Sequence, residues 1–436
     1  MKPFQLIDRS NGGSIKNDLL SGITVALALV PEAVAFAFVA GISPIVGLYG
    51  AFMMGFVTAV FGGRPGMISG ATGAMAVVMV SLVSQGNDLA GTESAGLQYL
   101  FATLLLAGLI QVSAGVLRLG KFVRMIPHSV MMGFVNGLAI VIFISQLGMF
   151  KKNGEWLAGN ALLVMLALVA ITMLIMALLP MLTKKVPAAL TGIVIVSLVV
   201  ILGDLETETV RSFIVANGGG GIKAGLPSFQ IPMISFSLET LFFIAPYAFI
   251  LAAIGLIESL MTLNLIDELT DTHGSGNREC IAQGTGNILN GFFGGMGGCA
   301  MIGQSIINVK SGGRGRLSGI TAALALLFFI LFGSNYIEQV PIAALVGVMF
   351  MVVLGTFAWS TFKVWNKVPN ADMIVIILVT VITVFFDLAI AVLSGVIVSS
   401  LVFAWENAKR IRARKYVDEH SVKHYEIYGP LFFGCI

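Results

Sequence analysis

GGMGGCAMIGQSIINV, residues 294–309, is a short apolar stretch broken by glycines and followed at once by Lys310, Arg314 and Arg316. A counterpart lies near residue 70, where SGATGAMAVVMVSLV, residues 69–83, also has a glycine-rich start and an apolar segment too short to cross a bilayer. Short interrupted segments at matching places in two halves of a chain are typical of transporters whose half-helices direct their N-termini at an anionic solute. The pair predicts a carrier of small anions.

The composition is that of a polytopic helical membrane protein. Of 436 residues, 57% are hydrophobic and 11% charged, and the mean hydropathy is +0.96. Such a chain holds many more long uncharged runs than a soluble core needs. Three scattered cysteines, Cys280, Cys299 and Cys435, predict free thiols rather than a disulfide framework or a metal site. The chain carries no nucleophile, metal or nucleotide motif of an enzyme, and its net charge of +3 gives no reason to expect nucleic acid as a partner.

Hydropathy predicts an all-α protein of about fourteen membrane segments arranged as seven plus seven. The expected segments are 18–41, 44–61, 73–84, 97–117, 126–149, 160–180 and 187–203, then 240–264, 278–295, 300–309, 317–334, 340–357, 371–386 and 388–405. An odd number per half inserts the halves in opposite orientations, which is an inverted repeat. The predicted divisions are an N-terminal segment (1–17), a first repeat (18–203), an extracytoplasmic linker (204–239), a second repeat (240–408) and a cytoplasmic tail (409–436).

The distribution of basic residues predicts the orientation. If both termini are cytoplasmic, every Lys and Arg falls in a loop or tail, and nearly all of the 25 lie on the cytoplasmic side. This bias is the positive-inside pattern. We therefore expect a multi-pass protein of the inner cell membrane, surrounded by the lipid bilayer. The four basic residues expected outside are Lys151, Lys152, Arg211 and Lys223.

The stretch PEAVAFAFVAGISPIVGLYGAF (31–52) resembles the signature of the SulP inorganic-anion transporters. Further similar stretches, in family order, are IPHSVMMGFVNGLAI (126–140), KVPAALTGIVI (185–195), AGLPSFQIP (224–232), GNRECIAQGTGNILNGFFGG (276–295) and FFDLAIAVLSGV (385–396). The resemblance implies a uracil-permease-like fold in which a core domain, spans 1–4 and 8–11, slides against a gate domain, spans 5–7 and 12–14, in an elevator-like motion.

The resemblance also implies a regulatory STAS domain after the last span. HYEIYGPLFFGCI (424–436) is similar to the first strands of that domain, so we expect the STAS domain to be truncated here. In a full-length protein it would make a homodimer.

The resemblance identifies the anion site as the facing N-termini of spans 3 and 10. Small residues there let a solute reach backbone N–H groups, and each helix end carries roughly half a positive charge. The alternative is that these residues only allow close helix packing. Many relatives have Ser-Arg-Ser in span 10, where this chain has Gly303, Gln304 and Ser305, so the usual cation is absent. The other residues carried over are Thr72, Gly73, Ala74, Ala300, Met301 and Ile302.

Two carboxylates fall inside predicted spans, Glu32 after Pro31 and Glu258 in AAIGLIESLMTLNL. Ionisable residues within a membrane are costly and usually functional. The alternative is a protonated carboxyl bonded to a nearby carbonyl. Thr262 lies one helical turn after Glu258, on the same face. We interpret Glu258, Thr262 and Glu32 as the cation-coupling residues, for H+ or for Na+ at Glu258 and Thr262. No other cofactor is expected.

The charge balance favours coupled transport. When an anion enters against an inside-negative membrane potential, the work is roughly 2.3 kcal/mol per charge for each 100 mV. A carboxylate about 6 Å from the anion adds roughly 3 kcal/mol of repulsion at an effective dielectric constant near 20, which cation binding would remove. In the sodium-coupled bicarbonate branch of the family that this chain resembles, the span-8 residue is Asp and spans 8 and 10 each supply a Thr. This chain keeps Thr262 but has Ile302 at the span-10 position, so H+ is slightly favoured over Na+.

We therefore predict symport of sulfate or bicarbonate with H+ or Na+. The alternatives are an anion exchanger or channel of the same family, and a nucleobase or organic-anion permease of the same fold. A channel would be expected to keep the span-10 Arg, and a nucleobase permease would need polar side chains where this chain has Ala74, Ala300 and Met301.

Overall fold

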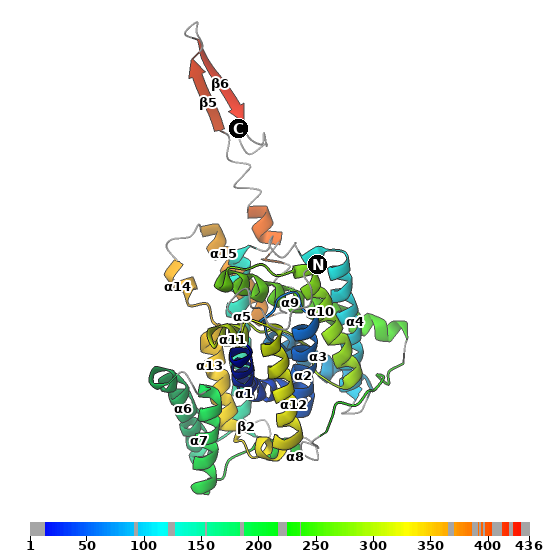
Figure 1. The fold of residues 1–436 in the computed structure, drawn as a ribbon, viewed down its shortest axis with the longest axis vertical. Helices are drawn as coiled ribbons and strands as arrows, with labels where there is room; N and C mark the ends of the chain where they lie inside the picture. The colour runs from blue at the N-terminus through cyan, green and yellow to red at the C-terminus, as the bar shows by residue number, and fades with distance from the viewer. Residues whose placement is uncertain are drawn as a thin grey trace. The chain divides into compact units, whose positions relative to one another are not determined.

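The structure is a computed structural model of the 436-residue chain, and its helices make up most of the fold (Figure 1). It describes residues 14–90, 95–120, 127–152, 155–183, 187–216, 225–235, 237–364, 370–385, 391, 394–395, 397–402, 412–417 and 422–428.

The elements follow the predicted order along the chain. The first half contains α1 (Ile15–Val39), α2 (Pro44–Phe61), β1 (Ser69–Ala71), α3 (Gly73–Ala90), α4 (Ala95–Val116), α5 (His128–Leu147), η3 (Gly148–Phe150), β2 (Lys151–Lys152), β3 (Glu155–Trp156), α6 (Gly159–Leu182), α7 (Ala188–Leu202) and α8 (Val210–Ala216). The second contains α9 (Leu238–Thr270), α10 (Gly276–Phe293), β4 (Gly298–Ala300), α11 (Ile302–Lys310), α12 (Arg316–Glu338), α13 (Ile342–Thr356), α14 (Ser360–Val364), α15 (Asn370–Phe385), β5 (Arg412–Val417) and β6 (Lys423–Tyr428).

Local signals explain where several helices begin and end. Helix α2 starts with Pro44 at its first position, where a missing N–H costs nothing. Helix α9 starts at the N-cap Ser237, whose hydroxyl accepts a hydrogen bond from the Thr240 N–H at 3.1 Å. Helix α10 ends at Gly294, whose φ of +69° is the left-handed conformation that glycine adopts without strain.

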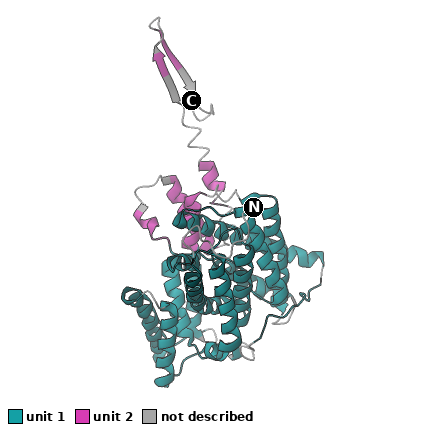
Figure 2. Cartoon of the chain, viewed as in Figure 1, with its two compact units in different colours: residues 1–125, 138–357 teal, residues 126–137, 358–436 magenta. Residues whose placement is uncertain are grey.

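The chain divides into two compact units, residues 1–125 with 138–357 and residues 126–137 with 358–436 (Figure 2). Within the first unit, α4 packs along α10, α1 lies against α12 and α2, and α6, α7 and α13 contact one another. Within the second unit, the Asn136 side chain donates to Thr361 and accepts from the Ala358 N–H, both at 2.9 Å.

Helix length and composition agree with a membrane protein. Eight helices within the described residues are long and apolar enough to cross a bilayer. Several of them expose large apolar side chains, as α6 does with Leu174 and Leu178 and α12 with Phe328 and Phe332. Because such surface is unfavourable in water, these faces fit contact with lipid.

Some predicted boundaries differ from the structure. The third span, expected at 73–84, continues as α3 to Ala90 through polar residues, and the eighth, expected at 240–264, continues as α9 to Thr270. The predicted linker 204–239 contains α8, and its Val210 N–H donates to the Val340 carbonyl at 2.9 Å. Half of the fourteenth span, 388–405, lies outside the described residues, as do residues 429–436 of the STAS-like stretch.

The prediction that every basic residue lies in a loop or tail is wrong for residues that the structure places in helices, among them Arg278 in α10, Lys310 in α11 and Arg316 in α12. Arg64 lies in the loop between α2 and β1, as predicted, but it is buried. Arg64 and Arg316 are 8% and 6% exposed, and Arg316 is the first residue of α12. The Arg316 guanidinium donates to the carbonyls of Ala59 and Gly62 at 2.9 and 2.7 Å. These acceptors belong to the C-terminal end of α2, where a cation complements the helix dipole, so sequence patterns alone could not distinguish this arginine from a loop residue.

Candidate anion and cation site

Two three-residue strands bring the two glycine-rich motifs together. Strands β1 and β4 pair in antiparallel register, Ser69 opposite Ala300, Gly70 opposite Cys299 and Ala71 opposite Gly298. Helix α3 begins two residues after β1, and α11 begins two residues after β4. Each helix start therefore lies next to the same strand pair, which the sequence did not predict.

Both helices have identifiable N-terminal caps. The carbonyl of Thr72 accepts the first helical hydrogen bond of α3, from the Ala76 N–H at 3.0 Å, and the carbonyl of Met301 accepts that of α11, from the Ser305 N–H at 3.0 Å. The next three N–H groups of each helix, at residues 73–75 and 302–304, have no acceptor within their own helix. Together with the helix dipoles they give each end an affinity for anions.

Side chains from neighbouring helices hold the strand pair rigidly. The Asn287 side chain of α10 donates to the Gly298 carbonyl at 3.1 Å and accepts from the Gly298 N–H at 3.0 Å. From α9, Ser259 Oγ accepts the Ala300 N–H at 3.1 Å. On the other strand, Gln283 Nε2 donates to Ser69 Oγ at 2.9 Å. The helix starts therefore rest on a fixed frame.

Glu258 lies at this frame and is linked to Thr72 through a cysteine. The Cys299 thiol donates to Glu258 Oε2 at 2.9 Å, and the Cys299 sulfur lies 3.2 Å from Thr72 Oγ1. Glu258 is half-buried, whereas Cys299 and Thr72 are buried. Thr262 is buried on the same helix, and its hydroxyl donates at 2.8 Å to the backbone carbonyl of Glu258.

Glu32 meets Gln304 near the start of α11. Glu32 is half-buried and follows Pro31, which lies within α1. Its carboxyl group is in contact with the Gln304 side chain. The Nε2 atom of Gln304 is buried and completes no hydrogen bond of ordinary geometry within the described residues. A polar amide is thus held beside the second carboxylate, next to the helix start.

The glycines of the two helix starts differ in the space around them. A side chain at Gly303, which is exposed, would meet no atom within 4 Å. A β-carbon at Gly73 would lie 2.8 Å from atoms of Phe36 and Ile142. Of these two glycines, Gly303 at the start of α11 has open space beside it, and Gly73 at the start of α3 does not.

The remaining predicted residues occupy buried positions. Ala74 and Met301 are buried and Ile302 is half-buried. Ala300 lies in β4 rather than in α11, and packs in a core cluster with Met67, Leu260, Leu263 and Cys280. The Ser305 hydroxyl accepts from the Ile68 N–H at 3.0 Å and donates to the Ile68 carbonyl at 3.3 Å. In this structure Ala300 and Ser305 therefore support the frame.

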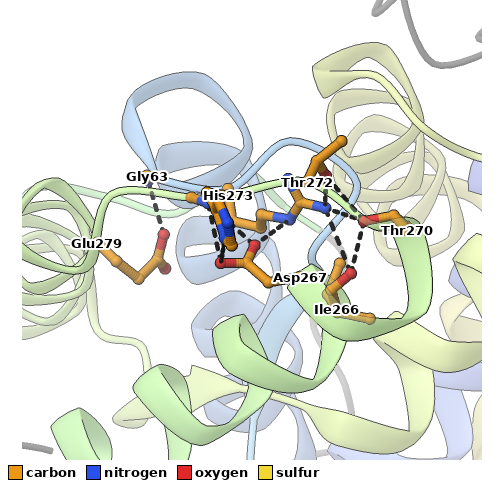
Figure 3. Close-up of polar contacts among 9 residues, drawn as sticks. Gly63, Ile266, Asp267, Thr270, Thr272, His273 and Glu279 are labelled. Carbon is orange, nitrogen blue, oxygen red and sulfur yellow. Dashed lines mark hydrogen bonds and ion pairs between the residues drawn. The ribbon is translucent and has the colours of Figure 1, made fainter. Parts of the chain in front are cut away.

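Sequence reasoning missed a second polar cluster, at the ends of α2, α9 and α10. Arg64 Nε lies 3.0 Å from Asp267 Oδ1, and Arg64 also donates to Thr270 and, at 2.5 Å, to Thr272. Asp267 in turn accepts the Gly274 N–H at 2.9 Å. Figure 3 labels Asp267, Thr270 and Thr272, the three residues that contact Arg64 here. The pair explains why α9 continues through polar residues to Thr270.

The same region contains a fully buried carboxylate, Glu279. Its Oε2 accepts the Gly63 N–H at 2.7 Å (Figure 3), and its Oε1 accepts Gln283 Nε2 at 2.7 Å. Because Gln283 also bonds Ser69, Glu279 connects the end of α2 to strand β1. The only sequence signal was an acidic residue in the first turn of a helix, which is common and carries no functional implication.

Among the residues with described structure, no group of three or more His, Cys, Asp or Glu side chains is arranged to hold a metal ion. Cys280 and Cys299 are free thiols, as predicted. Cys435 lies outside the described residues.

Comparisons with known proteins agree with this architecture. The model of the sulfate permease family matches residues 15–154 and 153–380. The chain is 44% identical over 426 residues to the putative sulfate transporter YbaR of Bacillus subtilis, with 97% of this chain and 84% of YbaR covered. It is 32% identical to the bicarbonate transporter BicA of a Picosynechococcus species, with 99% of this chain and 81% of BicA covered.

Solved structures give the same result. The transmembrane domain of a cyanobacterial bicarbonate transporter BicA matches with a TM-score of 0.74 at 32% identity, covering 86% of this chain and 97% of that domain. SLC26A9 matches with a TM-score of 0.78 at 19% identity, covering 94% of this chain and 69% of SLC26A9, and this likeness concerns the fold alone.

Proposed function

Because this chain belongs to the sulfate permease family, a family of membrane transporters and not of enzymes, we propose that it carries a small inorganic oxyanion together with H+ or Na+. The substrate class follows from its relatives, which are named for sulfate and for bicarbonate. Both are small oxyanions, and both can accept hydrogen bonds from the backbone N–H groups of a helix start.

One observation carries the proposal. Two capped helix starts, at Thr72 and Met301, adjoin one rigid strand pair, and the carboxylate of Glu258 reaches that pair through Cys299. The oxyanion would bind the N–H groups at 73–75 and 302–304, with Gly303 leaving room for it. Thr72 supplies a hydroxyl beside this position. Ala74, Ala300, Ile302 and Ser305 support the backbone that carries those groups.

Glu258 is the proposed cation site. An ionised carboxylate beside an oxyanion would be repelled by roughly 3 kcal/mol at about 6 Å, and a bound cation removes that cost. The Thr262 hydroxyl donates a hydrogen bond to the backbone carbonyl of Glu258 and so supports this turn of α9. Glu32, in contact with Gln304, is the proposed second carboxylate of the coupling site.

The transport cycle we propose is elevator-like. A core of spans 1–4 and 8–11 would carry the anion site past a gate of spans 5–7 and 12–14, in the inner cell membrane with both termini cytoplasmic. The hairpin of β5 and β6 is the described part of the tail. In a protein with a complete STAS domain, that domain would form the homodimer.

Uptake into proteoliposomes tests the proposal. Labelled sulfate and labelled bicarbonate are offered in parallel, with an inward Na+ gradient, an inward H+ gradient or neither, and protein-free vesicles serve as the control. Accumulation of one anion above its equilibrium level under one gradient is expected. Movement that needs only an anion on the opposite side would instead identify an exchanger, and uptake of uracil without either anion would identify an organic permease.

A further inference from the structure

Cys299 lies between the proposed anion and cation groups and contacts both. Its thiol donates to Glu258 Oε2 at 2.9 Å, and its sulfur lies 3.2 Å from the hydroxyl oxygen of Thr72. Cys299 and Thr72 are 0% and 2% exposed, so the contact between them is shielded from solvent, whereas Glu258 is half-buried. Thr72 caps α3, one of the two proposed anion-binding ends.

The direction of these hydrogen bonds is determined by the number of protons. A thiol has a single proton. Since the Cys299 proton is donated to Glu258, the sulfur can only accept from Thr72, and the Thr72 O–H must be the donor. The chain of donors therefore runs from Thr72 to Cys299 to Glu258. With Glu258 free of a cation, the Thr72 hydroxyl is occupied by sulfur.

The backbone around Cys299 is unusually well fixed. Its strand partner is Gly70, and its neighbours Gly298 and Ala300 are bonded to Asn287 and Ser259. Ser259 follows Glu258 on α9, so two consecutive residues of α9 contact two consecutive residues of β4. The thiol therefore cannot follow Glu258 or Thr72 if either moves.

We infer that Cys299 is a positioning residue that couples cation binding at Glu258 to anion binding at Thr72. This inference rests on the proposed function. A cation at Glu258 neutralises the carboxylate and weakens its bond from the thiol, so the thiol proton is no longer held and sulfur becomes a poorer partner for Thr72. The Thr72 O–H is then free to donate to the oxyanion. By linkage, an anion that accepts a hydrogen bond from the Thr72 O–H raises the affinity for the cation by the same factor.

The inference predicts a specific effect on coupling. Coupling is measured as the ratio of the anion half-saturation concentrations without and with a saturating level of the driving cation, using labelled sulfate or bicarbonate, whichever the protein accumulates. Typical couplings between sites are 5–150-fold. In Cys299→Ala the ratio should fall severalfold, to the part that direct repulsion between Glu258 and the anion provides, while the maximal rate with cation stays within about twofold. Cys299→Ser, which keeps a donor and an acceptor, should keep the ratio.

Two further variants make the test decisive. Cys280→Ala removes the other described buried thiol, which lies in the core cluster with Ala300, and should leave the ratio unchanged. Thr72→Val keeps the shape of the side chain but removes the hydroxyl at the other end of the relay, so it should lower the ratio as far as Cys299→Ala does. Either variant alone is a test if the other one folds poorly.

The outcomes separate this inference from the proposed function. If Glu258→Gln abolishes cation dependence while Cys299→Ala keeps the full ratio, the relay is wrong and the proposed cation site stands. If Cys299→Ser loses the ratio as completely as Cys299→Ala, the thiol does not act through its hydrogen bonds and the relay is also wrong. If Glu258→Gln retains cation dependence, the proposed cation site itself fails.

Discussion

Asn287 and Gly298 are joined by two hydrogen bonds that run in opposite directions, from the Asn287 amide to the Gly298 carbonyl at 3.1 Å and from the Gly298 N–H to the Asn287 oxygen at 3.0 Å. A side-chain amide here replaces a backbone partner on the outer edge of β4. Asn287 also donates to Gln111 Oε1 at 2.9 Å, which ties α4 to the same strand. Strand β4 is thereby held at both of its edges.

Asn287→Ala should destabilise the protein and disorganise the anion site together. The change leaves both backbone groups of Gly298 buried without their partner, at a cost of about 1–3 kcal/mol for each unsatisfied group. A lower thermal unfolding midpoint, followed by tryptophan fluorescence, and a weaker anion affinity are expected. Asn264→Ala, on α9, is the control. An unchanged midpoint in Asn287→Ala would contradict the role given to this bond pair.

Arg64 and Asp267 should stabilise the fold more as a pair than each does without the other. Their side chains are 7% and 11% exposed, so removing one partner leaves a nearly buried charge, which typically costs about 3–5 kcal/mol. Arg64→Gln and Asp267→Asn should each lower the unfolding midpoint strongly, and the double variant should recover part of the loss. Strictly additive losses would mean that the two side chains stabilise the protein independently.

Gly303→Leu should block anion transport while leaving the fold intact. The substitution places a side chain into open space at the first turn of α11, in front of the proposed anion position. The matched control is Gly355→Leu, because Gly355 on α13 is also exposed and its side chain would also meet no atom within 4 Å. Normal uptake by Gly303→Leu, with an unchanged unfolding midpoint in both variants, would move the anion away from α11.

Gln304→Arg should strengthen anion binding and weaken cation dependence. The structure directs Gln304 towards Glu32, so the new guanidinium would pair with that carboxylate and leave a fixed positive charge beside the helix start. A lower anion half-saturation concentration and a smaller response to the cation gradient are expected in one preparation. Gln304→Met, of similar size and without charge, controls for bulk. If both quantities stay at their original values, residue 304 does not take part in the charge balance.

The sequence was enough to predict the helical membrane fold and the pairing of the two glycine-rich motifs. The candidate site residues Thr72 and Gln304 came from the family resemblance, carried over position by position, and they stay predictions. The strands Ser69–Ala71 and Gly298–Ala300 were not predicted, because Gly, Ala, Ser and Cys have little strand preference and the pairing joins residues more than 200 positions apart. Cys299 was predicted only to be a free thiol, because its partners Glu258 and Thr72 lie on other elements and far away in the sequence.

The burial of individual side chains also could not be inferred from the hydropathy pattern of the sequence. Arg64 and Arg316 occupy short polar stretches that resemble exposed loops, and acceptors such as the carbonyls of Ile266 and Ala59 make their burial favourable. The family resemblance predicted that Ala300 lies at the start of span 10, yet Ala300 lies in β4 opposite Ser69, and its side chain packs in the core.

Gradient-driven uptake by Glu258→Gln tests the central claim, that Glu258 binds the driving cation, most directly. The amide keeps the size of the side chain and removes its charge. With labelled anion in proteoliposomes, we expect no accumulation above equilibrium under the cation gradient that drives the unmodified protein, while exchange of labelled for unlabelled anion continues. Glu268→Gln, on an exposed position of the same helix, should accumulate anion normally. Full gradient-driven accumulation by Glu258→Gln would contradict the account.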